Sequence, residues 1–234
     1  MKKKIISIIP ARSGSKGIIN KNIKPLSGEP LIAWSIKFAL ENEHISDCIV
    51  STDSYEIAEI AQNYGAEIPF IRDKKLASDT AKSSDVILDV IKRCELDPKA
   101  VFVLLEPTSP YRLHKSFEKC LEVLKTNNLR KIVSIQECIS NSFQFQFFRN
   151  NNTKLNPVNI SNSYNDLRRQ DIEKSFFLDG SFYMSYISDF MKHPGFIGEG
   201  TGSFVNDYFS SFEIDSEEDL KLMQAIFSTI GTPF

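Results

Sequence analysis

The sequence predicts an α/β protein built on a doubly wound, mostly parallel β-sheet. Short apolar runs alternate with segments of helical periodicity through the first half of the chain, as in βαβ units. The first run, residues 5–9, is IISII, which is typical of a strand covered on both faces. Polar clusters follow three of the runs, and ligands of such sheets bind at the carboxyl ends of the strands.

The first strand leads into a loop that combines small residues with cations. Gly14 and Gly17 allow backbone N–H groups to approach a ligand, and Arg12, Lys16 and Lys21 add positive charge, which indicates a polyphosphate site. Lys16 precedes Gly17 and the loop has two glycines, so neither a P-loop nor a dinucleotide fingerprint fits. The alternative is an ordinary surface loop with solvated cations.

The remaining elements of the first half follow from periodicity and capping. A proline in the first turn favours a helix over residues 30–42, and Asp53 to Glu56 fits a capping box for a helix that ends near Tyr64. Ser83 or Ser84 fits the N-cap of another helix. Strands are predicted at residues 48–51, 68–71 and 101–105.

Three of these strands deliver polar residues to one edge of the predicted sheet. The first delivers the glycine-rich loop, the second Ser-Thr-Asp at residues 51–53, and the last Glu-Pro-Thr-Ser-Pro at residues 106–110. Because the carboxyl ends of parallel strands meet at the same edge, we expect these clusters to form one site.

The second half of the chain is aromatic: 14 of the 18 phenylalanines lie after residue 140. Alternation predicts a strand at residues 142–148 and another at 175–186, separated by an Asn- and Ser-rich loop at 149–165. We expect a single domain, residues 1–234, in which residues 140–185 contribute a dimerisation excursion. Core packing and an ordinary loop are the alternative use of these residues.

Two carboxylates belong to a short predicted strand at residues 213–215. Glu213 and Asp215 alternate across one residue, so on a strand both would face the same side and share a Mg²⁺ ion. Ser216 and Asp219 fit the cap of a final helix at residues 217–227, and capping is the alternative role for the acidic residues.

Composition excludes several classes of protein. Lys and Arg number 28 against 30 Asp and Glu, so no basic field favours nucleic acid or a membrane surface. The four cysteines and three histidines are scattered, which argues against a zinc site or a disulfide framework. No apolar run approaches the length of a membrane span. We therefore expect a cytoplasmic protein.

Several spaced motifs resemble those of the CMP-sialic acid synthetases, the acylneuraminate cytidylyltransferases. They are ARSGSKG at residues 11–17 with NKN at 20–22, VSTD at 50–53, LASDTAKSS at 76–84, LLEPTSPYR at 104–112, RRQ at 168–170 and EID at 213–215. The resemblance implies a Rossmann-like nucleotidyltransferase fold, a homodimer and Mg²⁺. It implies transfer of a cytidylyl group from CTP to the anomeric hydroxyl of an acidic nine-carbon sugar, with release of pyrophosphate.

The resemblance also implies roles for individual residues. Phosphate-binding and catalytic roles fall on Arg12, Lys16 and Lys21. The nucleotide would further contact Ala11, Ser13, Gly14, Ser15, Gly17, Asn22, Arg72 and Ser83. The sugar would contact Glu106, Thr108, Ser109, Arg168, Arg169 and Gln170, and the metal Glu213 and Asp215. Without the resemblance, Arg72 reads as a surface cation and Ser83 as a helix cap.

Some positions depart from the family pattern. The family has an aspartate where this chain has Glu213, a glutamine at Glu106, a lysine near Gln144, an arginine at Phe177, and NGAIY where this chain has DGSFY at residues 179–183. The acceptor is therefore open among N-acetylneuraminate, legionaminate, pseudaminate and the eight-carbon acid Kdo, and a catalytically inactive nucleotide-binding relative is the alternative from another class. No residue stands out as the general base.

Overall fold

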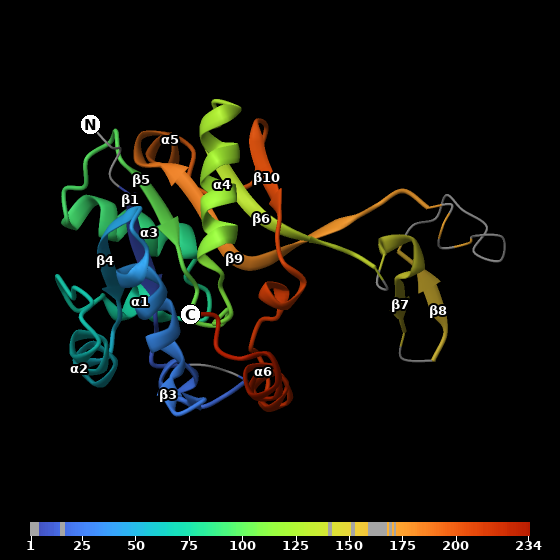
Figure 1. Ribbon diagram of the computed structural model, residues 1–234, viewed down its shortest axis with the longest axis horizontal. Helices are drawn as coiled ribbons and strands as arrows, with labels where there is room; N and C mark the ends of the chain where they lie inside the picture. Colours follow the sequence, from blue (N-terminus) through green and yellow to red (C-terminus); the bar gives the residue numbers. More distant parts are fainter. Residues whose placement is uncertain are drawn as a thin grey trace.

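A six-stranded β-sheet forms the centre of the protein (Figure 1). In this computed structural model, which describes residues 5–14, 17–139, 142–150, 153–158, 168, 170 and 172–234, the strand order is β10-β6-β9-β5-β1-β4. The strands are β1 (Ile5–Pro10), β4 (Ile45–Ser51), β5 (Val101–Leu104), β6 (Lys131–Glu137), β9 (Phe176–Tyr186) and β10 (Thr201–Val205). Only β9 runs antiparallel to its neighbours, so the predicted mostly parallel sheet is confirmed.

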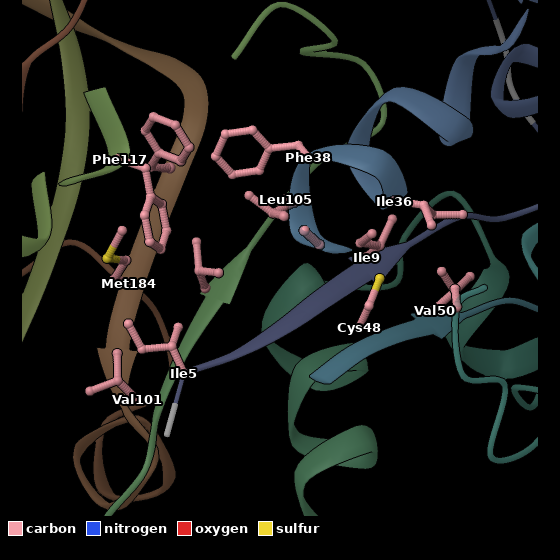
Figure 2. Packing of buried hydrophobic residues seen from close by; sticks show 14 of the residues in the cluster. Ile5, Ile9, Ile36, Phe38, Cys48, Val50, Val101, Leu105, Phe117 and Met184 are labelled. Atoms are coloured by element: carbon pink, nitrogen blue, oxygen red, sulfur yellow. The ribbon is translucent and has the colours of Figure 1, made fainter. Parts of the chain in front are cut away.

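Helices cover both faces of the sheet, as the prediction of a doubly wound fold requires. They are α1 (Leu31–Glu41), α2 (Tyr55–Asn63) and α4 (His114–Thr126) on one face, and α3 (Ser83–Arg93) and α5 (Ile187–Lys192) on the other. Strand β1 serves both cores because its side chains alternate: Ile5 and Ile9 join the first cluster and Ile6 and Ile8 the second. Figure 2 shows the first cluster. Burial of each such side chain contributes about 1.5–3 kcal/mol.

A third core brings the C-terminal segment to the first loop. Helix α6 (Glu217–Ile230) packs on α1 and on the hairpin of β2 (Pro25–Leu26) and β3 (Glu29–Pro30). The ring of Trp34 meets that of Phe227 edge-on, 4.8 Å between centroids. As predicted, Ser216 and Asp219 form a capping box that starts α6. This packing fixes residues 213–216 beside the loop that follows β1.

Four local predictions were wrong. Residues 68–71 are not a strand in the described chain; within them, Ile71 forms an isolated bridge with Thr52. The N-cap of α2 is Ser54 and not Asp53, which bonds elsewhere. Helix α3 begins at Ser83 itself, so its N-cap is Lys82. The segment from Glu213 to Asp215 is not a strand. Helix α4 and strands β6 and β10 were not predicted.

Between β6 and β9 the chain leaves the sheet, and the described residues among 138–175 form an arm that projects from the body (Figure 1). The predicted strand at 142–148 is instead a 3-10 turn, η3 (Phe143–Phe145), followed by a short hairpin, β7 (Phe147–Arg149) and β8 (Leu155–Pro157). The predicted loop at 149–165 falls partly outside the described residues. Residues 179–185, expected in the excursion, are part of β9 in the central sheet.

Candidate active site

One cleft at the carboxyl ends of the parallel strands collects most of the predicted site residues. Its volume is about 530 Å³. The predicted residues that line it are Arg12, Gly17, Lys21, Asn22, Arg72, Ser83, Glu106, Thr108, Glu213 and Asp215. Residues that follow β1 and β5 therefore converge with residues of the C-terminal segment, as the fold class predicts, whereas residues 51–53 are not among the described lining residues.

The other predicted residues that the structure describes do not line this cleft. Ala11 and Ser109 are buried, Ser13 and Gly14 are exposed, and the exposed Arg168 and Gln170 belong to the arm. Ser15, Lys16 and Arg169 lie outside the described residues. No role was predicted for the three histidines, and none of them is a described lining residue of the cleft. His114, for example, stacks its ring on that of Phe38, with 4.8 Å between centroids.

The first side of the cleft, formed by Arg12, Lys21 and Arg72, is called the cationic wall here. Arg12 Nη1 lies 2.8 Å from Asp79 Oδ1, and it donates a longer hydrogen bond, 3.4 Å, to the Ala77 carbonyl. Lys21 Nζ donates to the Ile214 carbonyl at 2.9 Å and to Asp215 Oδ1 at 2.8 Å. Each of these two cations is thus paired with a carboxylate.

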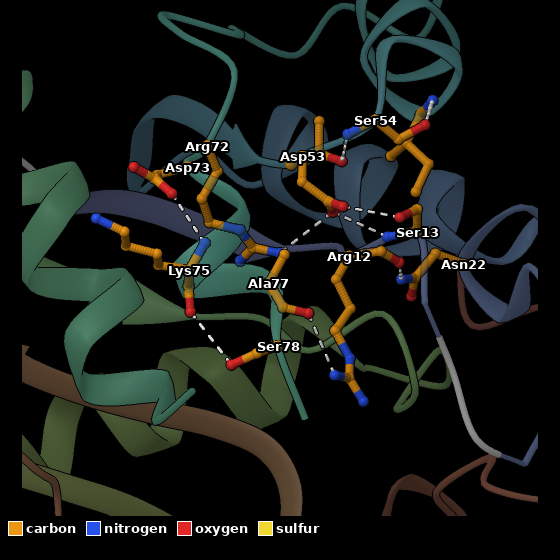
Figure 3. A network of polar contacts seen from close by, with 12 residues as sticks. Arg12, Ser13, Asn22, Asp53, Ser54, Arg72, Asp73, Lys75, Ala77 and Ser78 are labelled. Atoms are coloured by element: carbon orange, nitrogen blue, oxygen red, sulfur yellow. Dashed lines mark hydrogen bonds and ion pairs between the residues drawn. The ribbon is translucent and has the colours of Figure 1, made fainter. Parts of the chain in front are cut away.

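A polar network supports the cationic wall from behind (Figure 3). The amide and hydroxyl of Ser13 donate to Asp53 at 2.9 and 2.7 Å, and Arg72 Nη2 lies 3.8 Å from the same carboxylate. Partial burial would raise the pKa of Asp53, but the Ser13 hydrogen bonds and the nearby Arg72 hold it below its usual value. Asp53 is therefore a support for the first loop.

Arg72 is buried, with 4% of its surface exposed, and it lines the cleft. Burial lowers the pKa of its guanidinium, and no hydrogen-bond partner for Nε is found in the part of the chain that the structure describes. A buried donor without a partner is costly, so this group is suited to a ligand. Arg72 is not a solvated surface cation.

A second charged group, called the acidic wall, consists of Glu106, Asp179 and Glu213 around Arg112; Glu106 and Glu213 line the cleft, and Asp179 and Arg112 are buried. Arg112 is fully buried and donates to the Ser181 and Glu106 carbonyls at 2.9 and 2.7 Å. Burial lowers the pKa of Arg112 to about 10, while the three carboxylates favour its charged form. One buried cation therefore balances three acidic groups.

The negative charge of the acidic wall is crowded. Burial, and then Glu106, Asp215 and Asp179, raise the pKa of Glu213 to about 7. Burial also raises the pKa of Glu106. This excess of carboxylates beside an open cleft favours a bound cation.

Gly180 makes the close approach of the acidic wall possible. Its φ is +72°, and a Cβ there would lie 1.6 Å from Glu213 Oε1 and 2.6 Å from Ser109 Oγ. Only glycine fits this backbone shape and this space. The neighbouring Asp179 is buried and accepts hydrogen bonds from the Ser134 hydroxyl and the Ser181 amide. Gly180 and Asp179 thus hold this part of β9 close to Glu213 and Ser109.

Two carboxylates suit a metal ion. Glu213 and Asp215 are not on a strand, yet Ile214 between them is buried and both acidic side chains line the cleft. An all-oxygen donor set is what Mg²⁺ prefers. Among the described residues no cluster of three or more His, Cys, Asp or Glu suited to a metal is found, so the pair would need ligand or water oxygens to complete a shell.

Sequence reasoning missed three residues of the site: Asp79, Arg112 and Asp179. Each lies within a motif quoted above, but none was assigned a role. Spacing alone could not reveal them because their partners come from distant segments; Arg112, for example, reaches Ser181. Asp53 was expected near the site, but its role as a support for Ser13 was not predicted.

A doubly wound sheet whose cleft is lined by cations of the loop after its first strand and by carboxylates suits nucleotidyl transfer. Residues 6–227 match the family model described as cytidylyltransferase, and the chain belongs to that family.

Several known proteins are similar to this chain. Post-translational flagellin modification protein B of Campylobacter coli is 32% identical over 94% of this chain and 93% of its own length. CMP-N,N'-diacetyllegionaminic acid synthase of Legionella pneumophila is 31% identical over 95% and 96%. The structure of a CMP:2-keto-3-deoxy-manno-octonic acid synthetase complexed with CTP superposes with a TM-score of 0.70 at 14% identity, covering 97% of this chain and 99% of that one.

Proposed function

We propose that this cytidylyltransferase activates an acidic nine-carbon sugar of the sialic, legionaminic or pseudaminic acid type. The acceptor's anomeric hydroxyl gives up its proton, and its oxygen bonds to the α-phosphorus of CTP. The bond between the α-phosphorus and the oxygen that bridges to the β-phosphorus breaks, and pyrophosphate leaves. The observation that carries the proposal is the cleft itself, which is lined by cations of the cationic wall and by carboxylates of the acidic wall. The name of the Legionella relative, a CMP-legionaminic acid synthase at 31% identity, supports the sugar class.

The cationic wall would bind the triphosphate. Arg12 and Lys21 face the cleft, Lys16 is predicted to join them, and the backbone from Ala11 through Ser13, Gly14 and Ser15 to Gly17 would surround the phosphates. Positive charge fixed where charge develops on the leaving pyrophosphate is the main electrostatic means of catalysis. Asn22 would contact phosphate or ribose, and Arg72 and Ser83 the cytosine.

The acidic wall would bind the sugar. Glu106 and Thr108 line the cleft, and Ser109 lies beneath it with a buried hydroxyl for which no partner occurs among the residues described. Carboxylate and hydroxyl oxygens accept hydrogen bonds from sugar hydroxyl and amide groups. By the resemblance, Arg168, Arg169 and Gln170 would contact the sugar; the described Arg168 and Gln170 lie in the arm, so a second copy of the chain would present them in the proposed homodimer.

We assign Glu213 and Asp215 as the residues that would hold Mg²⁺. When bound, the ion would offset negative charge on the nucleotide phosphates. The crowded charge of the acidic wall, reflected in the raised pKa of Glu213, fits such a cation.

We further propose that the enzyme is a cytoplasmic homodimer joined through the arm. The arm and the adjoining start of β9 expose large apolar side chains: Ile139, Phe143, Phe147, Phe148, Leu155, Phe176, Phe177 and Leu178. Such a patch is typical of a protein interface. The helices that the structure describes are too short or too polar to cross a bilayer. Light scattering on the intact chain should give twice the monomer mass, and Phe148→Glu should reduce it.

The activity is tested by pyrophosphate release from CTP and Mg²⁺ with N-acetylneuraminate, legionaminate, pseudaminate and Kdo, using UTP and ATP as nucleotide controls. We expect release with CTP and one nine-carbon acid, and no release when the metal is chelated. Release with Kdo alone would contradict the sugar class. CTP binding without release on any acceptor would favour the inactive, nucleotide-binding alternative.

A further inference from the structure

We propose that Asp79 occupies the place of a substrate phosphate on Arg12 in the free enzyme, and that nucleotide binding exchanges this carboxylate for phosphate. The inference rests on the proposed triphosphate role of Arg12. It assigns Asp79 as a residue that sets the affinity for nucleotide, and the segment 77–81 as a part of the cleft that the nucleotide detaches from the first loop.

Two contacts join this segment to Arg12. The guanidinium pairs with Asp79 at 2.8 Å and donates to the Ala77 carbonyl at 3.4 Å (Figure 3 shows the second contact). Ser78, Asp79 and Ala81 all line the cleft. An anion from the protein therefore meets the cation where an anionic substrate would bind.

The pair is built to separate. The side chains of Arg12 and Asp79 are 32% and 46% exposed, so the carboxylate can return to water without being buried unpaired. The pair of Lys21 and Asp215 differs in its cation, because the Lys21 side chain is only 14% exposed. Exposed pairs contribute little net stability, whereas a guanidinium binds phosphate through strong charge-assisted hydrogen bonds.

Electrostatics makes the exchange necessary. A triphosphate brings several negative charges to Arg12, and a carboxylate retained 2.8 Å from the same guanidinium would repel them. Once released, segment 77–81 is free to move relative to the first loop. It leads directly into α3, whose Ser83 and Val86 line the cleft. The exchange therefore links triphosphate binding to the part of the cleft where we place the cytosine.

The test is the dissociation constant of CTP, measured by calorimetry on the intact enzyme without acceptor. Asp79→Asn should bind CTP about two- to fivefold more tightly, the range set by the weak pair that it removes. Asp85→Asn is the matched control, because Asp85 is an exposed carboxylate on the first turn of α3 and its loss removes the same charge. It should leave the affinity unchanged. Equal or weaker binding by Asp79→Asn overturns the inference.

Arg12→Ala separates this inference from the proposed function. If Arg12→Ala binds CTP as tightly as the parent enzyme, the triphosphate role of Arg12 is wrong. If it binds more weakly but Asp79→Asn gives no gain, only the exchange is wrong. In the double variant with Arg12→Ala, the gain from Asp79→Asn should disappear, because Asp79 acts through Arg12. A gain that persists would mean that Asp79 acts through another cation, which contradicts the exchange.

Discussion

The two walls of the cleft hold their charges in different ways. On the cationic wall, Arg12 pairs with the partly exposed Asp79, and Lys21 with an Asp215 side chain that is 75% exposed. On the acidic wall, Arg112 is completely buried and three carboxylates surround it. The first arrangement can change partners when a ligand arrives, and the second cannot.

This difference predicts separate consequences for mutation. Exposed ion pairs contribute about 0–1 kcal/mol to stability, whereas removing one partner of a buried pair costs about 3–5 kcal/mol. Substitutions on the acidic wall should therefore affect stability, and those on the cationic wall should affect nucleotide chemistry.

The largest effect is expected for Arg112→Met. It leaves buried carboxylates without their cation and removes the donors to the Ser181 and Glu106 carbonyls, so the free energy of unfolding should fall by about 3–5 kcal/mol. Urea denaturation measures the change. The control is Arg130→Met, which breaks the exposed pair with Asp189 and should cost about 1 kcal/mol or less. Equal losses in the two variants would remove the distinction between the walls.

Lys21→Ala should lower turnover by about 10²-fold, because it removes a cation from the place where charge develops on the leaving group. Its stability should change by only about 1 kcal/mol. Initial rates of pyrophosphate release give the first quantity and urea denaturation the second. Lys24→Ala is the control, since it breaks a similar exposed pair with Glu217, and neither residue is a described lining residue of the cleft. Unchanged turnover in Lys21→Ala would remove Lys21 from the site.

Glu213→Gln should stabilise the metal-free protein at high pH. The pKa of Glu213 is raised from 4.5 to about 7, so the folded state binds the proton more tightly than the unfolded state. The contribution of Glu213 is therefore complete below pH 4.5 and declines as the pH rises through 7. Because the group is only half-buried, we expect a gain of about 1 kcal/mol.

Thermal unfolding at pH 5 and pH 8 compares Glu213→Gln with the parent protein. The gain should appear at pH 8 and be smaller at pH 5. Glu118→Gln, an exposed substitution on α4, should show no such difference. A gain of the same size at both pH values would mean that the charge of Glu213 is not what destabilises the protein.

The smallest effect is expected for Ser13→Ala. The Ser13 hydroxyl donates to Asp53 at 2.7 Å in an exposed setting, and its amide bond to the same carboxylate survives the change. The loss in stability should be below about 1 kcal/mol in urea denaturation at pH 7. A loss as large as that of Arg112→Met would show that the cationic wall is as rigid as the acidic wall.

The sequence was informative where local patterns decide structure. The buried run of β1, the capping box at Ser216 and Asp219, and the glycine and cation pattern of the first loop all depend on neighbouring residues. Their places in the fold could therefore be predicted, and the carboxyl-end rule brought Arg12 and Glu106 together.

The sequence was less informative where distant partners decide. Phenylalanines at residues 142–148 alternate as in a strand, but their setting is a projecting arm, so a 3-10 turn and a short hairpin form instead. The roles of Arg112 and Asp179 depend on distant segments: Arg112 donates to Ser181, 69 residues away, and Asp179 accepts from Ser134, 45 residues away. Local periodicity contains no information about such contacts.

The contact between the first loop and residues 214–215 has a consequence for folding. A Cβ on Gly17 would lie 2.2 Å from the Asp215 carbonyl oxygen, and Lys21 reaches Ile214 and Asp215 across more than 190 residues. Contacts this distant in sequence form late, because loop-closure entropy opposes them. During synthesis, the strands up to β5 are made long before the segment that completes the cleft. The site should therefore be among the last parts of the protein to assemble, and a nascent chain that lacks residues 213–230 could build much of the sheet but have no place for nucleotide.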